Sequence, residues 1–386
     1  MKTFLRNITI VLSVAVGIFS ILALLLTKED LSLLTSATNS VLEKILTTTT
    51  TRTTTNANIN TNINTNTNTD TNIIPENIMP ATTTTTARLI PRLIRQTFLA
   101  VEQAEGAGAR VRRSIGNAKL RNFSPFLMLD HFTSSAGGFP DHPHRGQETI
   151  TYLIDGAIDH EDFAGNRGRL GAGDLQFMTA GRGIVHAEMP VHGEDGKPNV
   201  GLQLWVDLPK KLKACEPRYR DLRAEEIPIA EADEGKVKIK VISGQSQGVD
   251  SVRDLAYTPV WLLDIEIQPG GKIVQPLPEG WNAFAYVLEG EVLIGEEGNQ
   301  RPVGQFHNAV FEGEGQAVYA AVDKGAERSA RFVLVAGTPL DQKIVQYGPF
   351  VLTSQEEVYQ AFMDYQTHSN GFERAAGWES EIGKRI

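Results

Sequence analysis

The chain has 386 residues, 41% hydrophobic and 22% charged, a balance that indicates about two or three globular domains and excludes wholesale disorder and a polytopic membrane protein. Lys and Arg number 37 against 46 Asp and Glu, a net charge of −9, so direct nucleic-acid binding is not expected. The single cysteine, Cys215, excludes an internal disulfide and a cysteine-based zinc site and leaves His and carboxylate side chains as candidate metal ligands.

An uncharged apolar segment, residues 8–26 (ITIVLSVAVGIFSILALLL), lies near the N-terminus. At about 1.5 Å per residue, a helix of this length is close to the thickness of a bilayer core. Lys2 and Arg6 precede the segment, which favours a transmembrane-like signal anchor within residues 1–30. A secretory signal peptide is the alternative, although no clean cleavage site follows Leu26.

Thr and Asn dominate the next segment, which we assign to residues 31–96 and which contains TTTTTRTTT and NANINTNINTNTNTDTN. These side chains offer little apolar surface to offset the entropy of ordering the backbone. We therefore predict a disordered, low-complexity linker with no chemistry of its own.

Short strand-like runs follow, separated by Gly, Pro, Asp and Asn: ETITYLI, LQLWVDL, VKIKVIS, WLLDIEI, AFAYVL, EVLIG and RFVLVAG. This pattern predicts an all-β fold of the sandwich or barrel type. Residues 148–156 align with residues 282–290, so we predict two copies of one barrel unit, joined between Pro228 and Lys236. Ser354 and Glu357 form a capping box, which predicts a helix that continues to Thr367.

Two pairs of candidate ligands have a spacing of two residues: His142 with His144, and His186 with Glu188. Side chains at i and i+2 of a strand point to the same face, so the four groups converge if the two strands are neighbours. Three imidazoles and a carboxylate suit iron, manganese, copper or nickel and leave up to about two coordination positions open. Glu148 competes for the carboxylate role, and spacing alone does not decide between it and Glu188.

Long motifs link this region to a known family: FPDHPHRGQET, HEDFAG, GDLQFMTAGRGIVHAEMP and LQLWVDLP. In these motifs the chain resembles the pirin family, a group of bicupins within the cupin superfamily, over nearly all of residues 97–386. The resemblance implies two cupin barrels (double-stranded β-helix or jelly-roll) in tandem, with a C-terminal helix. The N-terminal, metal-binding cupin domain is expected at residues 97–230 and the metal-free one at residues 231–386.

The resemblance also implies a ligand set for one iron ion, ferrous or ferric, per chain. Matching the HPH and HAE motifs favours Glu188 over Glu148, which becomes a group that lines the barrel or orients a ligand. In the second repeat, Pro276 and Pro278 stand where the first has its HPH histidines, so no second site is expected. The implied ligands are His142, His144, His186 and Glu188.

Two functions follow from the resemblance. Many pirins resemble quercetin 2,3-dioxygenases, which implies a flavonol and dioxygen as substrates and Glu188 as both ligand and catalytic base. Animal pirins resemble nuclear, iron-dependent co-regulators of transcription, which implies a transcription-factor partner and no turnover. A membrane-anchored or secretory location follows if the N-terminus is part of the protein in the cell; otherwise the family implies nucleus or cytoplasm.

Three other side chains near the motifs have alternative interpretations. His160 and Asp162 either approach the metal or stabilise a turn, and the turn is favoured. Arg145 either orients an anionic substrate or forms an ordinary ion pair.

Overall fold

The computed structural model describes residues 88–385 except 106–107, 135–136, 192 and 194–195. The predicted membrane anchor at residues 8–26 and most of the predicted linker lie outside the described residues. Within the described part of the chain, no helix is long and apolar enough to cross a membrane. The end of the predicted linker differs from expectation, because residues from Ile94 onward belong to a paired strand, β1.

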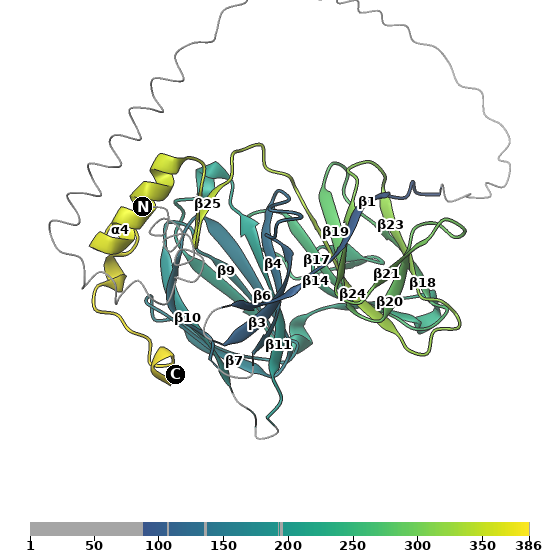
Figure 1. Cartoon of the computed structure of the whole chain (residues 1–386), viewed down its shortest axis with the longest axis horizontal. Helices are drawn as coiled ribbons and strands as arrows, with labels where there is room; N and C mark the ends of the chain where they lie inside the picture. Colours follow the sequence, from purple (N-terminus) through teal and green to yellow (C-terminus); the bar gives the residue numbers. More distant parts are fainter. Residues whose placement is uncertain (1–87, 106–107, 135–136, 192, 194–195, 386) are drawn as a thin grey trace, which may run out of the picture. The chain divides into compact units, whose positions relative to one another are not determined.

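The first barrel consists of two antiparallel sheets (Figure 1). The larger has the order β12-β9-β6-β11-β4-β3-β2, with β2 Glu102–Glu105, β3 Ala109–Ile115, β4 Phe126–Ser134, β6 Gln147–Asp155, β9 Leu175–Thr179, β11 Asn199–Asp207 and β12 Arg218–Leu222. The smaller has the order β5-β10-β7-β8, with β5 Phe139–His144, β7 Ala157–Asp162, β8 Arg167–Gly171 and β10 Ile184–Val191.

The second barrel repeats this arrangement. Its larger sheet has the order β1-β22-β19-β24-β17-β14-β13, with β1 Ile94–Leu99, β13 Ile229–Ala232, β14 Val237–Ser243, β17 Val260–Ile267, β19 Asn282–Glu289, β22 His307–Phe311 and β24 Ala330–Gly337. Its smaller sheet has the order β18-β23-β20-β21, with β18 Lys272–Pro276, β20 Glu291–Ile294, β21 Arg301–Gly304 and β23 Ala317–Ala321.

The predicted internal repeat is confirmed by the strand order. The aligned segments form β6 and β19, and each lies third in its larger sheet, between equivalent neighbours. β5 and β10 of the first barrel correspond to β18 and β23 of the second, which pair in the same way. Two hairpins complete the strands: β15 Gln245–Ser246 with β16 Val249–Asp250, and β25 Val345–Tyr347 with β26 Phe350–Leu352.

One apolar core joins the two larger sheets. Alternate residues of β4, β6 and β11 point away from the first barrel and pack against residues of β19, β22 and β24. The rings of Phe126 and Phe284 meet edge to face at 5.2 Å between centroids. His131 and Tyr286 also contact each other across this interface, with Nδ1 3.1 Å from the phenol oxygen.

The predicted C-terminal helix is confirmed as α4, Gln355–Thr367. Its N-cap is Ser354, whose hydroxyl oxygen accepts a hydrogen bond from the Glu357 N–H at 3.2 Å. Figure 1 shows α4 beside the first barrel, although the segment follows the second barrel in sequence. Val358 and Ala361 of α4 pack with Val185 of β10, so the end of the chain covers the smaller sheet of the first barrel.

The interiors of the two barrels differ in polarity. The second is filled by aliphatic side chains such as Ile265, Val287 and Val318. The first buries polar side chains of β6 and β10, among them Gln147, Thr151 and His186. Buried polar groups are costly unless they have partners, so this polarity points to a site inside the first barrel.

Candidate metal centre

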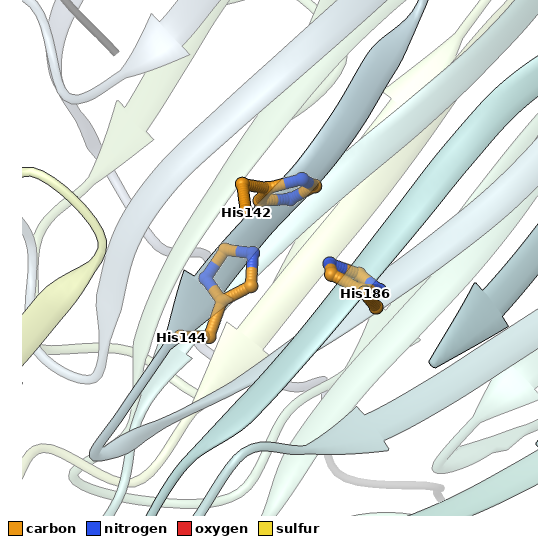
Figure 2. Close-up of side chains that lie close together, drawn as sticks. All are labelled: His142, His144 and His186. Atoms are coloured by element: carbon orange, nitrogen blue, oxygen red, sulfur yellow. The ribbon is translucent and has the colours of Figure 1, made fainter. Parts of the chain in front are cut away.

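Two neighbouring strands of the smaller sheet of the first barrel carry the predicted ligand pairs. β5 and β10 are antiparallel partners, and their register places His186 directly opposite His142. The register of β10 against β5 shifts between His186 and Glu188. Such irregularities change the direction of side chains and are common near functional sites. Figure 2 shows His142 and His144 on one strand and His186 on the next, with their rings facing one another.

The three imidazoles form a tight cluster. One nitrogen from each of His142, His144 and His186 lies within 4.8 Å of the others. The ring centroids are 4.4 Å apart for His142 and His186, and 5.0 Å for His144 and His186. His144 and His186 are buried and His142 is half-buried, so the cluster reaches the surface on the side of His142. Among the described residues, it is the one group of three or more side chains with metal-ligand geometry.

Burial keeps these imidazoles neutral. Desolvation, together with the neighbouring His186, lowers the pKa of His142 to about 4. Desolvation and nearby His160 lower the pKa of His186 to about 3, and burial holds the pKa of His144 well below its ordinary value. Neutral imidazole is the form that binds a metal, so the cluster is ready to coordinate near neutral pH.

The partner of each Nδ1 atom decides which ring nitrogen is available for coordination. Nδ1 of His142 lies 2.8 Å from the carbonyl oxygen of Pro140, which can only accept, so Nδ1 carries the proton and Nε2 has the free lone pair. Nδ1 of His144 lies 3.0 Å from Nε2 of Gln147, an orientation in which the amide donates to Nδ1 and leaves the His144 proton on Nε2. An amide turned to present its oxygen accepts the Nδ1 proton and gives His144 the same tautomer.

Gln147→Leu is expected to weaken metal binding about tenfold, because His144 loses the group that fixes its tautomer and ring orientation. The measurement is a Co²⁺ titration followed by absorption. Gln275→Leu, at a buried glutamine of β18 in the second barrel, serves as the control. Equal affinities for the two variants would contradict the orienting role.

Glu188 lies next to the histidine cluster. Its Oε2 is 4.0 Å from Nε2 of His186. The carboxylate accepts hydrogen bonds from the Thr151 hydroxyl at 3.4 Å and from Nε2 of Gln203 at 3.1 Å. Gln203 in turn accepts from the indole N–H of Trp205 at 3.2 Å, and the Trp205 ring meets His144 edge-on. This chain of contacts fixes the carboxylate without using all of its lone pairs.

The structure places Glu148 away from the cluster. Its carboxylate accepts hydrogen bonds from Thr179 at 2.7 Å and from the backbone N–H groups of Tyr257 and Thr258 at 2.9 Å. Glu148 therefore holds the 257–258 backbone against the first barrel, and its hydrogen bonds join different parts of the fold. Position favours Glu188 over Glu148, since Glu188 lies beside His186; the group of ligand atoms within 4.8 Å contains the three histidines and not Glu188, so Glu188 as a ligand stays a prediction.

The remaining candidates have structural partners. Asp162 accepts from the N–H groups of Ala164 and Asn166, so the turn interpretation is confirmed for this residue. His160 is buried and stacks on Tyr219, but it lies opposite Glu188 in the pairing of β7 with β10, and its Nε2 has no hydrogen-bond partner among the described residues, so it lies beside the cluster and the turn interpretation is not confirmed for it. Arg145 forms a buried ion pair with Asp364 at 2.7 Å, which confirms the ion-pair interpretation.

Sequence reasoning missed the groups that orient the ligands. Gln147, Gln203 and Trp205 lie on β6 and β11, in the larger sheet opposite the ligand strands. The alternation of side chains along β6 and β11 could have indicated these three residues, because it places each of their side chains on the face toward the barrel interior. Glutamine and tryptophan are unremarkable strand residues until the opposite sheet is known.

The residues present fit a bound transition-metal ion. Both ring nitrogens of His186 are buried without a hydrogen-bond partner among the described residues. A buried imidazole without partners is costly, and coordination of one nitrogen removes part of that cost. Nitrogen donors with a nearby carboxylate suit iron, manganese, copper or nickel more than magnesium or calcium, which prefer oxygen ligands.

The paired jelly-roll barrels and the single histidine cluster define a two-barrel protein of the cupin type. Residues 108–206 match the family model described as Pirin, and residues 262–371 match the one described as Pirin C-terminal cupin domain. The chain is 48% identical to human Pirin over 287 residues, covering 74% of this chain and 96% of the human protein. The chain therefore belongs to the pirin family.

Other relatives agree in sequence and in fold. A pirin-like protein of Solanum lycopersicum is 46% identical over 292 residues, covering 75% of this chain and 97% of that protein. The crystal structure of a quercetin 2,3-dioxygenase from Acinetobacter baumannii superposes with a TM-score of 0.66 and 28% identity, covering 72% of this chain and 98% of that structure.

Proposed function

We propose that this protein is an iron-dependent dioxygenase of the quercetin 2,3-dioxygenase type, acting on flavonols, and that His142, His144, His186 and Glu188 hold the iron. The observation that carries the proposal is the cluster of three neutral imidazoles within 4.8 Å, with a carboxylate beside it. The similarity to a quercetin 2,3-dioxygenase structure supports the choice of reaction.

The metal ion would supply Lewis acidity and open coordination positions for a flavonol and dioxygen. The chain's own residues then have separate roles. His142, His144 and His186 would hold the ion through neutral nitrogens, which do not reduce its positive charge. Glu188 is placed to accept the proton of the flavonol 3-hydroxyl, while Thr151 and Gln203 keep its carboxylate in place.

The surface around His142 determines how a flavonol would approach. The cavity beside Glu188 has a volume of about 30 Å³, room for a water molecule but not for an aromatic ring. His142 is half-buried, and the ring of Phe139 lies 6.3 Å from its ring. A flavonol would therefore approach from the exposed side of His142, with its 3-hydroxyl toward Glu188 and its ring system outside the small cavity that Phe139 and Glu188 line.

The test is oxygen uptake by iron-loaded protein with a series of flavonols, with carbon monoxide measured as a product. Glu188→Gln should retain part of the iron and lower kcat by about 100-fold or more, because a neutral amide cannot take the proton. Iron-free protein is the control. Iron-loaded protein that consumes no oxygen with any flavonol would refute the proposed reaction.

A second candidate is an iron-dependent transcriptional co-regulator that binds a transcription factor without turnover. The net charge of −9 favours it, because such a surface complements a basic protein better than DNA. A change between ferrous and ferric iron adds a whole charge inside the barrel, which can bias nearby loops. Equal affinity of the ferrous and ferric forms for a candidate partner would refute this switch.

Location separates the two candidates. We propose a membrane-anchored or secreted protein if translation starts at Met1 and includes residues 8–26. We propose a nuclear or cytoplasmic protein if translation starts near Thr97. A luminal location excludes the nuclear role and is compatible with oxygenase chemistry. Fluorescent tagging of the full chain beside a chain that starts at Arg88, which keeps β1 whole, decides between them.

A further inference from the structure

The last part of the chain, residues 345–385, packs on the strands that carry the histidine cluster. This part, here called the C-terminal segment, contains β25, β26, α4 and the tail after α4. Its apolar side chains Phe350, Val358 and Phe372 form one cluster with Val185, the residue before His186. The second barrel comes between this segment and the first barrel in sequence, so the contact joins distant parts of the chain.

Arg145 is the centre of this contact. It follows His144 directly, and its guanidinium is buried. Nη1 donates to Oδ2 of Asp364 at 2.7 Å, and Nη2 donates to the carbonyl oxygen of Asn370 at 2.6 Å. Nε donates to the carbonyl oxygen of Arg182 at 2.6 Å, in the turn that leads into β10. One side chain thus joins the end of β5, the start of β10 and the C-terminal segment.

The backbone of the first barrel also approaches the C-terminal segment closely at two glycines. Gly146 has a φ of +81°, and a Cβ there would lie 2.1 Å from the carbonyl oxygen of Val351 in β26. Gly183 has a φ of +148°, and a Cβ there would lie 2.9 Å from the Phe372 ring. The Phe372 ring also lies 4.7 Å from the Arg145 guanidinium. The turns that end β5 and begin β10 therefore pack so closely against the C-terminal segment that a side chain at either glycine would clash with it.

A second set of contacts lies at the other end of the two strands. The Ser380 N–H donates to Asp141 at 3.1 Å, next to His142. Ile382 packs against Ala187 and Met189, the residues on either side of Glu188. The C-terminal segment therefore contacts the neighbours of all the proposed ligands.

We propose that the C-terminal segment is a clamp that fixes the turns at the ends of the two ligand strands, and with them the orientation of the histidines, with Arg145 as its positioning residue. The clamp rests on the proposed metal centre, since its effect is to hold the histidine nitrogens at coordination distance. Arg145 touches neither metal nor substrate; it acts through His144 and the Arg182–Gly183 turn. Without the ion pair to Asp364, the barrels stay folded and β5 and β10 stay paired, while the turns that end β5 and begin β10 are free to shift.

The test compares Asp364→Asn with Asp264→Asn. Each substitution removes one buried carboxylate from an ion pair of 2.7 Å, Asp364 with Arg145 and Asp264 with Arg331 in the second barrel. Co²⁺ is the probe, because its absorption spectrum reports ligand geometry and its release to a chelator gives a dissociation rate. Thermal unfolding of the metal-free proteins measures the general loss of stability.

We expect Asp364→Asn to release Co²⁺ about tenfold faster than wild type and to change its spectrum, while Asp264→Asn does neither. Asp364→Glu, which keeps the charge, should restore the spectrum in part. If Asp364→Asn does not fold, Phe372→Leu carries the same expectation.

The possible failures are distinguishable. If wild-type protein binds Co²⁺ and the folded clamp variant matches Asp264→Asn in spectrum and rate, the clamp is refuted and the metal centre stands. If wild-type protein binds no Co²⁺, the proposed metal centre is refuted and the clamp falls with it.

Discussion

Replacing His186 with alanine is expected to reduce metal content from about one ion per chain to a trace, with affinity lowered by more than about 100-fold. His186 lies opposite His142 and close to His144, so its loss leaves the other two imidazoles on one strand without the donor from β10. Elemental analysis of protein purified with supplied iron, and a Co²⁺ titration of the metal-free form, measure the effect.

The same substitution should have only a small effect on the free energy of unfolding of the metal-free protein. Alanine leaves a small cavity, but it also removes two buried ring nitrogens that have no partner among the described residues. His307→Ala, in β22 of the second barrel, is the control and should keep full occupancy. Undiminished metal in His186→Ala protein, or in the double variant His142→Ala plus Glu188→Ala, would show that the ion is held elsewhere.

Acid is expected to destabilise the metal-free protein well above the pH at which most carboxylates titrate. Burial lowers the pKa of four histidines, and their ordinary value in the unfolded chain is about 6.5. As pH falls below 6.5 the unfolded state takes up protons that the folded state does not, so the free energy of unfolding falls until the folded-state pKa is reached. The four are His131, His142, His144 and His186.

Within that window, each such histidine contributes about 1.4 kcal/mol per pH unit to the fall. For His131, whose pKa is lowered to about 4, the window runs from about 6.5 down to about 4. Chemical denaturation of wild type and His131→Gln across this range measures the contribution of His131 to the free energy of unfolding. The contributions of buried carboxylates such as Glu148, whose pKa burial raises, are the same in both proteins and cancel in the difference. Parallel pH profiles for the two proteins would contradict the prediction.

Local pattern was sufficient to predict the all-β class, seven of the strands and the C-terminal helix. Alternating apolar residues predicted β6, β11, β14, β17, β19, β20 and β24, and the capping box predicted α4. The repeat could be predicted because residues 148–156 and 282–290 occupy the same place in equivalent sheets. The start of β1 was missed because its strand partner, β22, lies over 200 residues away and the preceding sequence is low in complexity.

The candidate site was predictable only in part, for a physical reason. The i, i+2 rule places two side chains on one face of one strand, so each ligand pair could be read locally. The adjacency of β5 and β10 is a tertiary fact, and so are the separation of Glu148 from the cluster and the contacts of Gln147 and Gln203. The ion pair of Arg145 with Asp364 joins residues 219 positions apart, and no local pattern indicates it.

The packing of residues 345–385 on the first barrel has a consequence for synthesis. The strands that carry the histidines leave the ribosome early, yet residues 345–385, which cover them, are made last. The strand that completes the larger sheet of the second barrel, β1, is made before the rest of that barrel. The second barrel therefore has all its strands once Gly337 is made, whereas the histidine cluster receives its cover only at the end of synthesis.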